Sequence, residues 1–366
     1  MEQLIGDGPS THAKEVFAAL SRSKNVLIAG PPGTGKTRLL AEITFWFKEA
    51  PGVGFNSKGD IPFPADKVSD FLPSPDRTDR KSFRVIFHPG TRYRHLLRGL
   101  EPVPNASGSF RYSKGTLYDA NEHAMRPDGT ALLVIDEINR GPAVEAFGDA
   151  IVSIEADKRL DDKNSAVPQS YPTRIPSDAG ELVDYYFSPH LYLLASMNSA
   201  DASVAPMDVA FLRRWEPFEL LPDVNIAKDA LGLTQSSGSS DGPQELLSAF
   251  VDAWEQVNDR ISLLRGAEYQ LGHAVAVPES GRELSELIPA MAFVGERWSQ
   301  IERHVHELFF GDPRAEVAVL GGMSEEMYRI SEGYLRTELT TRVIRPKLAT
   351  PEDWTLMLKA VAARAQ

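Results

Sequence analysis

The absences in this 366-residue chain limit what it can be. It contains no cysteine, which excludes disulfides and thiolate metal sites and is compatible with a reducing cytoplasm. No run of about eighteen apolar residues and no signal-peptide layout behind Met1 is present, so we expect a cytoplasmic protein without membrane contact. A net charge of −12 argues against a broadly basic nucleic-acid surface, and it confines any contact with DNA or RNA to a local site, a channel or a partner protein.

The strongest local signal is a glycine-rich loop between an apolar strand and a helix. The apolar run 26–29 is typical of a buried parallel strand, and apolar positions after the loop recur with helical spacing. The loop itself fits the phosphate-loop pattern G-x-x-x-x-G-K-[ST] without exception, with the residues Gly30, Pro31, Pro32, Gly33, Thr34, Gly35, Lys36 and Thr37. A glycine-rich turn that matches by chance is the alternative, and the flanking strand and helix disfavour it.

This loop predicts a site for a nucleoside triphosphate with Mg²⁺. Glycines allow backbone N–H groups to close around phosphate oxygens, and the following helix directs its positive N-terminal end toward them. Lys36 would place a charge at the β- and γ-phosphates, while the Thr37 hydroxyl would complete the coordination of Mg²⁺. The ligand class follows from the loop alone, but many unrelated machines share it.

Polar residues follow two further apolar strands. The strand expected over 131–135 ends in Asp136 and Glu137, and the strand expected over 191–197 ends at Asn198. Ligands of open α/β sheets bind at the carboxyl ends of parallel strands. We therefore expect Asp136 to hold Mg²⁺, Glu137 to orient or deprotonate the attacking water, and Asn198 to reach the γ-phosphate or that water. The alternatives are a solvated acidic strand end and an asparagine that forms a turn.

Two basic groups lie outside these strands. Arg213 and Arg214 close a short helical segment that begins near Met207; adjacent arginines are most often charged surface, but their place after the strand-end asparagine suggests an arginine supplied across a subunit interface. The second group follows the strand expected over 83–87 and can be a solvated helix face or a loop that grips nucleic acid or an acidic partner segment. It consists of Arg92, Tyr93, Arg94, His95 and Arg98.

The remaining pattern predicts the organisation of the chain, and its length suggests about two domains. Ser10 or Thr11 could cap an N-terminal helix, 51–81 reads as a surface insertion, and Phe147, Ile151 and Ile154 share one face of a helix. We also expect a hairpin loop at 105–109, a helix over 117–125, and a loop or hairpin in the proline-rich stretch 157–190. Helical spacing then predicts helices over 245–264, 282–310, 323–339 and 353–363, with a loop at 234–243.

The order of these motifs resembles that of AAA+ ATPases, and finer details are similar to the McrB family, the GTP-hydrolysing motors of methylation-dependent restriction systems. The similar segments are scattered over most of the chain, from about residue 26 to 312. They include Phe87-His88-Pro89, the stretch from Asp136 to Gly141, the stretch from Met197 to Asp201, and the lid segments from Tyr269 to His273 and from Leu308 to Asp312.

The resemblance implies an α/β fold: a P-loop core with a parallel sheet flanked by helices over residues 1–222, and an α-helical lid with a helical extension over 223–366. It makes Glu137 the catalytic carboxylate, Asn198 the sensor residue, and Arg213 or Arg214 the trans-acting finger of a ring, typically a hexamer. It also implies hydrolysis of ATP or GTP with Mg²⁺, coupled to a nuclease, McrC-like or other effector subunit in restriction or phage defence, with DNA contacted indirectly or in a central pore.

Three departures accompany the resemblance. Ala202 stands where the family signature has arginine, and Leu212 stands where many relatives have the first of three arginines. Both losses bear on hydrolysis rate and GTP preference, because that chemistry depends on positive charge around the transition state. The short stretch before the phosphate loop leaves no room for an N-terminal DNA-reading domain, so we expect a partner to supply specificity.

Two other functions remain open at this point. One is a MoxR-type remodelling ATPase that acts on proteins or inserts metal cofactors. The other is a nucleotide-dependent assembly switch that scarcely hydrolyses, which the alanine at position 202 favours.

Overall fold

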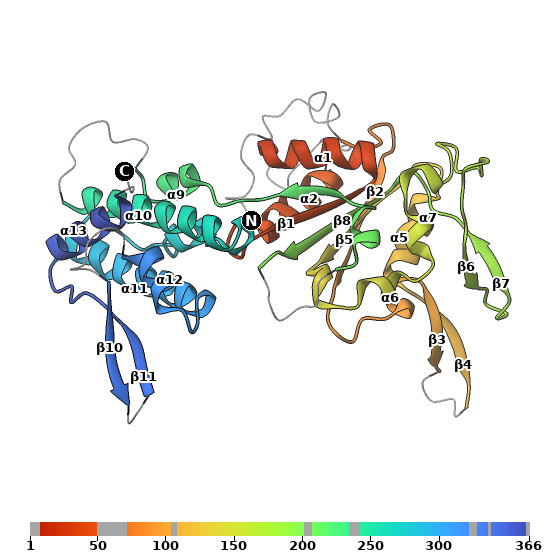
Figure 1. Ribbon diagram of the computed structural model, residues 1–366. Coiled ribbons are helices and arrows are strands. Elements are labelled where there is room, and N and C mark those ends of the chain that lie inside the picture. Colours follow the sequence, from red (N-terminus) through yellow and green to blue (C-terminus); the bar gives the residue numbers. More distant parts are fainter. Residues whose placement is uncertain are drawn as a thin grey trace. The chain divides into compact units, whose positions relative to one another are not determined.

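The computed structural model describes residues 8–49, 72–103, 108–200, 207–233, 242–321, 328–335 and 338–363 (Figure 1). The chain divides into two compact units, one of residues 1–29 and 36–219 and one of residues 30–35 and 220–366. The sequence predicted a boundary after residue 222, and it did not anticipate that the first six residues of the phosphate loop group with the second unit.

A five-stranded sheet with the order β2-β5-β8-β1-β9 forms the centre of the first unit. The pairs β2–β5, β5–β8 and β1–β9 are parallel. The strand that carries Asn198 therefore lies directly beside the strand that carries Asp136. The strands are β1 (Asn25–Gly30), β2 (Asp79–Ile86), β5 (Gly129–Asp136), β8 (Leu191–Asn198) and β9 (Glu216–Glu219).

Helices cover the sheet of the first unit. All eight residues of β5 are buried, as expected for a central parallel strand covered on both faces. Leu133, Ile135 and Leu193 join Leu117 and Phe147 in one apolar cluster. These helices are α1 (Thr11–Ser23), α2 (Lys36–Glu49), α4 (Tyr93–Leu96), α5 (Thr116–Ala124), α6 (Ala143–Phe147), α7 (Ala150–Ser153) and α8 (Val209–Leu212), with the short 3-10 helices η2 (Ile138–Arg140) and η3 (Ala156–Lys158). The predicted cap is present, because the Ser10 hydroxyl accepts a hydrogen bond from the backbone N–H of Ala13.

The helix predicted through Phe147, Ile151 and Ile154 is wrong in one respect: it is two short helices, α6 and α7. Gly148 separates them with a φ of +53°, in the left-handed region that favours glycine. A Cβ there would lie 2.9 Å from Tyr93 Cδ2, so the close approach of that ring also requires glycine. Phe147 and Ile154 are nevertheless buried in the same cluster.

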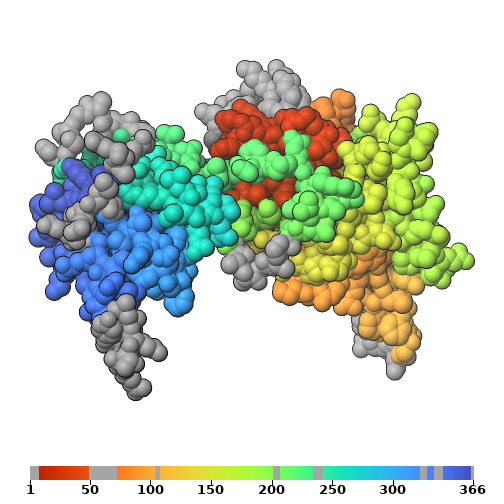
Figure 2. All heavy atoms as spheres, in the orientation of Figure 1, coloured from red at the N-terminus to blue at the C-terminus, as the bar shows by residue number. Residues whose placement is uncertain are grey.

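Two β-hairpins project from the first unit, in the stretches where the sequence predicted hairpins. β3 (Arg98–Pro102) pairs with β4 (Phe110–Lys114), and β6 (Thr173–Pro176) pairs with β7 (Leu182–Tyr185). The middle of the predicted loop at 105–109 lies outside the described residues. Figure 2 shows the β3–β4 hairpin standing out from the surface of the first unit.

The second unit is mainly helical around a core that includes Trp254 and Trp298. Met357 and Val361 are buried in it and Trp354 packs against it, as predicted. Most of the predicted loop at 234–243 lies outside the described residues. The elements are α9 (Val224–Ala230), α10 (Pro243–Leu264), η4 (Ala267–Tyr269), η5 (His273–Ala276), α11 (Leu287–Leu308), α12 (Pro313–Leu320) and α13 (Pro351–Ala362). Among the described residues, no helix is both long and apolar enough to cross a membrane.

The helix predicted over 323–339 is wrong. β10 (Arg329–Leu335) and β11 (Glu338–Ile344) form an antiparallel hairpin instead, with residues 322–327 and 336–337 outside the described part. The β-branched run at 340–344 favours a strand, and its pairing with 329–335 is invisible in a helical periodicity count. The base of the hairpin is fixed by the Tyr328 hydroxyl, which donates to buried Glu302 and accepts from Trp298 Nε1 at 2.8 Å.

Candidate nucleotide-binding and catalytic site

The phosphate loop has the backbone that its glycines predict. Gly33 and Gly35 have φ values of +79° and +85°, which residues with a Cβ rarely adopt. The Thr34 hydroxyl donates to the Pro31 carbonyl at 3.0 Å and closes the turn from within. Positive φ values of this kind allow successive backbone N–H groups to face a bound anion.

Within the second unit, the segment 272–274 holds the phosphate loop. The backbone N–H of Gly272 donates to the Pro32 carbonyl, and that of Ala274 donates to the Gly33 carbonyl, both at 3.0 Å. A Cβ on Gly272 would lie 2.0 Å from the carbonyl carbon of Gly33, so only glycine fits there. The lid segment that the sequence singled out on resemblance therefore contacts the loop directly through its backbone.

In the first unit, the sheet edge brings the other predicted residues together. A cavity of about 70 Å³ is lined by Lys36 and Thr37 at the start of α2, Asp136 and Glu137 at the end of β5, and Asn198 at the end of β8, together with Ser196 and Met197. These five candidates come from three elements that are far apart in the sequence. Their convergence follows from the parallel sheet, which presents its strand ends at one edge.

Burial shapes the chemistry of Lys36. The residue is 9% exposed, and burial lowers the pKa of its ammonium from 10.5 to about 8, partly offset by the carboxylates of Asp136 and Glu137. A lysine in this state gains more from a phosphate than an exposed lysine does, because the anion restores the charged form that burial disfavours.

Ser196 is a site residue that the sequence reasoning missed. Its hydroxyl donates to Asp136 Oδ1 at 2.6 Å and accepts from the backbone N–H of Glu137 at 3.2 Å. One hydroxyl thus fixes both the aspartate and the start of the following turn. The available signal was its position two residues before Asn198, which places both on one face of the strand.

Two arginines that were also missed contact the carboxylates. Arg84 Nη2 lies 2.8 Å from Asp136 Oδ2, and Arg140 Nε lies 3.2 Å from Glu137 Oε2. Glu137 has a left-handed φ of +54°, which turns the chain sharply after the strand. The available signal for Arg84 was that it is the one charged residue of the strand predicted over 83–87.

The donor set fits a magnesium ion delivered with phosphates. Mg²⁺ prefers a few protein oxygens together with phosphate and water oxygens, and the Thr37 hydroxyl and the Asp136 carboxylate line one cavity. Among the described residues, no group of three or more His, Cys, Asp or Glu could hold a metal alone.

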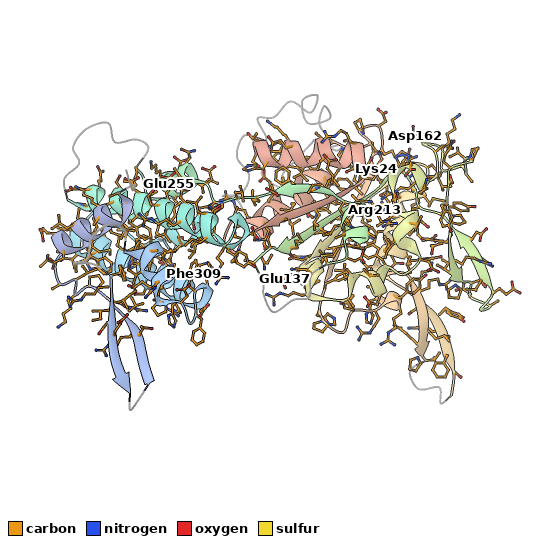
Figure 3. All side chains as sticks on the ribbon, in the orientation of Figure 1. Lys24, Glu137, Asp162, Arg213, Glu255 and Phe309 are labelled. Atoms are coloured by element: carbon orange, nitrogen blue, oxygen red, sulfur yellow. The ribbon has the colours of Figure 1, made fainter. Side chains whose placement is uncertain are left out.

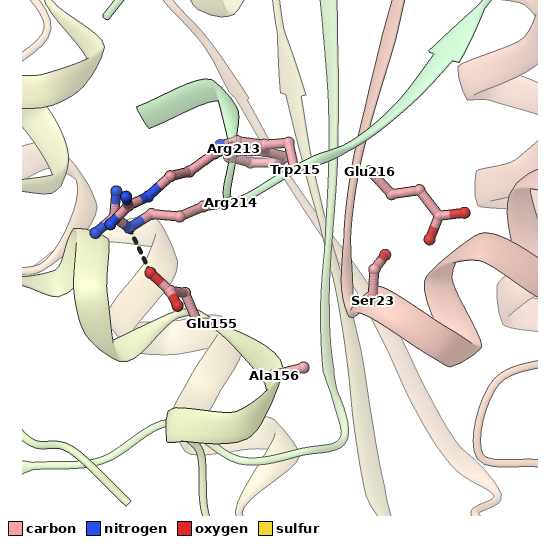
Figure 4. Close-up of a pocket in the computed structure, with 7 residues that line it drawn as sticks. All are labelled: Ser23, Glu155, Ala156, Arg213, Arg214, Trp215 and Glu216. Carbon is pink, nitrogen blue, oxygen red and sulfur yellow. Dashed lines mark ion pairs between the residues drawn. The ribbon is translucent and has the colours of Figure 1, made fainter. Parts of the chain in front are cut away.

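The paired arginines occupy different environments beside a cavity of about 450 Å³ (Figure 4). The side chain of Arg214 is 8% exposed, and its Nε lies 2.8 Å from Glu155 Oε1. Its carbonyl accepts from Asn25 Nδ2 at 3.0 Å, which ties the segment to β1. The neighbouring Arg213 is exposed. Of the two departures from the family pattern, Leu212 packs against the apolar core, and Ala202 lies outside the described residues.

The basic cluster splits in the same way. Arg98 is buried, is paired with Asp178, and has the ring of Tyr118 5.4 Å from its guanidinium. Arg92 and Arg94 remain exposed. The structure thus removes Arg98 from the predicted solvent-facing group and leaves a smaller one.

Comparisons with known proteins bear on the family that this chain resembles. The model of the AAA domain (dynein-related subfamily) matches residues 72–215. The EcoKMcrB subunit of the type IV methyl-directed restriction enzyme of Escherichia coli (strain K12) is 24% identical over 267 residues, which cover 73% of this chain and 50% of that protein. The YdiS component of the type II restriction enzyme BsuMI of Bacillus subtilis (strain 168) is 28% identical over 215 residues, 54% of this chain and 57% of that protein.

The chain spans about half the length of these curated relatives. The match to the structure of C. elegans PCH-2 covers 79% of this chain and 65% of the PCH-2 chain, at 13% sequence identity. Its TM-score of 0.34 is too low to bear on the fold. The predicted resemblance is confirmed by the curated relatives and the family model. The order of motifs, the parallel sheet and these matches support a McrB-like AAA+ NTPase.

Proposed function

We propose that this chain hydrolyses ATP or GTP with Mg²⁺, assembles into a ring, and couples turnover to a partner effector of a restriction or phage-defence system. The observation that carries this proposal is the convergence of Lys36, Thr37, Asp136, Glu137 and Asn198 on one cavity. Phosphoryl transfer needs mainly positioning and charge stabilisation, and these side chains supply both.

Each residue has a distinct role in this proposal. Lys36 binds the β- and γ-phosphates, and Thr37 and Asp136 hold Mg²⁺, which when bound neutralises charge on the phosphate oxygens. Glu137 orients the attacking water and accepts its proton. Asn198 directs its amide toward the γ-phosphate or that water, and the 3.0 Å bond from Asn139 Nδ2 to the Asn198 carbonyl fixes its backbone.

We assign the trans-acting role to Arg213 and a positioning role to Arg214. Figure 3 labels Arg213 and Glu137 at separate places of the first unit, which supports a role for Arg213 at the site of a neighbouring subunit. Arg214 is held by Glu155 and is not available to a neighbour without breaking that pair. An exposed arginine on an anchored segment suits a finger that enters the site of the next subunit.

The effector is proposed from the relatives, which are a subunit and a component of restriction enzymes. We propose a nuclease or McrC-like partner, with DNA reached through that partner or through a central pore. The exposed Arg92 and Arg94 are the candidates for a pore contact, and phosphate contacts there would make binding strongly dependent on salt.

Steady-state phosphate release with ATP and with GTP tests the enzymatic proposal. Wild-type turnover should exceed that of Glu137→Gln by at least about a hundredfold, and it should rise when the partner is added. Turnover equal to that of Glu137→Gln with both nucleotides would support the assembly switch. That alternative is also favoured by Leu212, which packs against the core at a position where many relatives have arginine. A neighbouring gene for a von Willebrand-type metal-site protein would favour the MoxR-type alternative.

A further inference from the structure

More cationic groups surround the carboxylates of Asp136 and Glu137 than the predicted roles use. Lys36 lines the cavity with Asp136 and Glu137, and each carboxylate also contacts an arginine: Arg84 at Asp136 and Arg140 at Glu137. Three cationic groups therefore face two carboxylates. Such a set suits an anion and repels a free divalent cation.

The geometry of Arg84 bears directly on the metal ligand. Its Nη2 lies 2.8 Å from Asp136 Oδ2, while the Ser196 hydroxyl donates to Oδ1 at 2.6 Å, so both oxygens of the carboxylate have donors. The Asp136 side chain is 13% exposed and that of Arg84 is 57% exposed. The carboxylate is thus shielded from water, whereas the guanidinium has solvent beside it.

A cation that binds Asp136 must share or displace the Arg84 contact. A free Mg²⁺ ion would also lie close to Lys36 and two guanidinium groups, whose three positive charges exceed the two negative charges of the carboxylates. A nucleoside triphosphate brings several negative charges to the same place, and it can then pair with the lysine and offset the repulsion.

We propose that Arg84 makes metal binding at Asp136 conditional on nucleotide, so that the chain takes up the metal–nucleotide complex and does not bind the free ion. This inference rests on the proposed role of Asp136 as a magnesium ligand. Arg84 is a positioning residue here, since it acts through Asp136.

Mn²⁺ binding to the nucleotide-free full chain, measured by electron paramagnetic resonance, tests the proposal. Wild type should bind weakly, and Arg84→Ala should bind about tenfold or more tightly because one repelling charge is gone. Arg84→Gln retains a donor without the charge and should follow Arg84→Ala, whereas Arg84→Lys should remain near wild type. Adding Asp136→Asn to Arg84→Ala should abolish the gain.

Arg126→Ala is the matched control. The Arg126 side chain is 63% exposed, and its guanidinium lies 3.6 Å from Oδ2 of Asp79, which belongs to the same strand as Arg84. The substitution therefore removes a similar charge at a place away from the site. Equal Mn²⁺ affinity of wild type and Arg84→Ala, or wild-type behaviour of Arg84→Gln, would overturn the inference. Failure of wild type to bind a fluorescent nucleotide with Mg²⁺ would instead contradict the proposed function, and the Mn²⁺ comparison would still decide the role of Arg84.

Discussion

At the scale of single residues, the site is defined by charged side chains that are largely buried. Lys36 is the clearest case, because burial lowers its pKa to about 8 while the lysine remains beside two carboxylates. Ser196 and Arg84 then fix the orientation of Asp136 from opposite oxygens. These contacts orient the Asp136 carboxylate in the ligand-free chain, and a bound metal ion would share or displace the one from Arg84.

The pKa of Lys36 predicts a pH dependence of nucleotide binding. The free protein loses the lysine proton as pH rises through about 8, and phosphate binding favours the protonated form, so affinity should be highest below that pH and fall above it. We expect a loss of about tenfold between about pH 7 and about pH 9 in fluorescent-nucleotide titrations. Lys36→Gln should bind weakly at both pH values. A wild-type affinity that stays flat across this range would contradict the assignment.

Residue-scale prediction from sequence was incomplete for a physical reason. Lys36, Asp136 and Asn198 belong to local patterns in which strand and loop determine the chemistry. Ser196 and Arg84 act only because β8 and β2 lie on either side of β5. That neighbourhood is a property of sheet order, which the sequence pattern did not specify.

At the scale of elements, glycines and buried pairs fix the loops that carry function. Gly272 is the most restrictive example, because its Cα lies against the backbone of Gly33. The segment after α8 is fixed differently, by the Glu155–Arg214 pair and the bond from Asn25 to the Arg214 carbonyl.

Gly272→Ala should weaken nucleotide binding. A Cβ placed 2.0 Å from the Gly33 carbonyl carbon forces either the phosphate loop or the 272–274 segment to move. We expect at least about a tenfold loss of affinity, corresponding to about 1.4 kcal/mol. Gly295→Ala in α11 is the control, because its new methyl would meet Trp354 at an ordinary 3.4 Å. Equal affinities of the two variants would show that the 272–274 contact does not hold the loop.

Substitutions of the two arginines after α8 should differ in their effect on the free energy of unfolding. Arg214→Ala leaves Glu155 without its partner in a partly buried place, so we expect a loss of about 1–3 kcal/mol in the free energy of unfolding. Arg213→Ala removes an exposed side chain and should change it by less than about 0.5 kcal/mol. Urea titrations measure both, and the anchoring role of Arg214 would be wrong if the two variants were equally stable.

Elements with strong local signals were predicted correctly, including four strands of the sheet, the capped helix α1 and the long helices α10 and α11, whereas the edge strand β9 was not predicted. The errors lie where a distant contact decides. The ring of Tyr93 requires a glycine that divides the predicted helix at 148, and the pairing of 329–335 with 338–344 replaces a predicted helix with a hairpin. Local periodicity contains neither contact.

At the scale of the whole molecule, we propose that each chain supplies part of a catalytic site and that a neighbouring subunit supplies the rest. The carboxylates and the exposed arginine of one chain lie in separate places of the first unit (Figure 3). In the proposed ring, the arginine of one subunit would reach the site of the next, and an isolated subunit should therefore turn over slowly.

Assembly should depend on nucleotide. Sizing of the wild-type chain with a nonhydrolysable triphosphate should give a ring, because a bound γ-phosphate offers Arg213 of the neighbour a partner. Arg213→Ala should assemble less readily at the same concentration, with Arg126→Ala as an exposed-arginine control. A persistent monomer with and without nucleotide would remove the basis for a finger role.

The most direct test of the account is hydrolysis by mixed subunits. Glu137→Gln lacks the catalytic carboxylate and Arg213→Ala lacks the finger, so each variant alone should release phosphate at background rate. In an equal mixture, some interfaces combine an intact Glu137 with an intact Arg213 from the neighbour, and we predict that phosphate release returns to a measurable fraction of wild type. A mixture as inactive as either variant alone, under conditions where wild type turns over and both variants assemble, would contradict the claim that the site is shared between subunits.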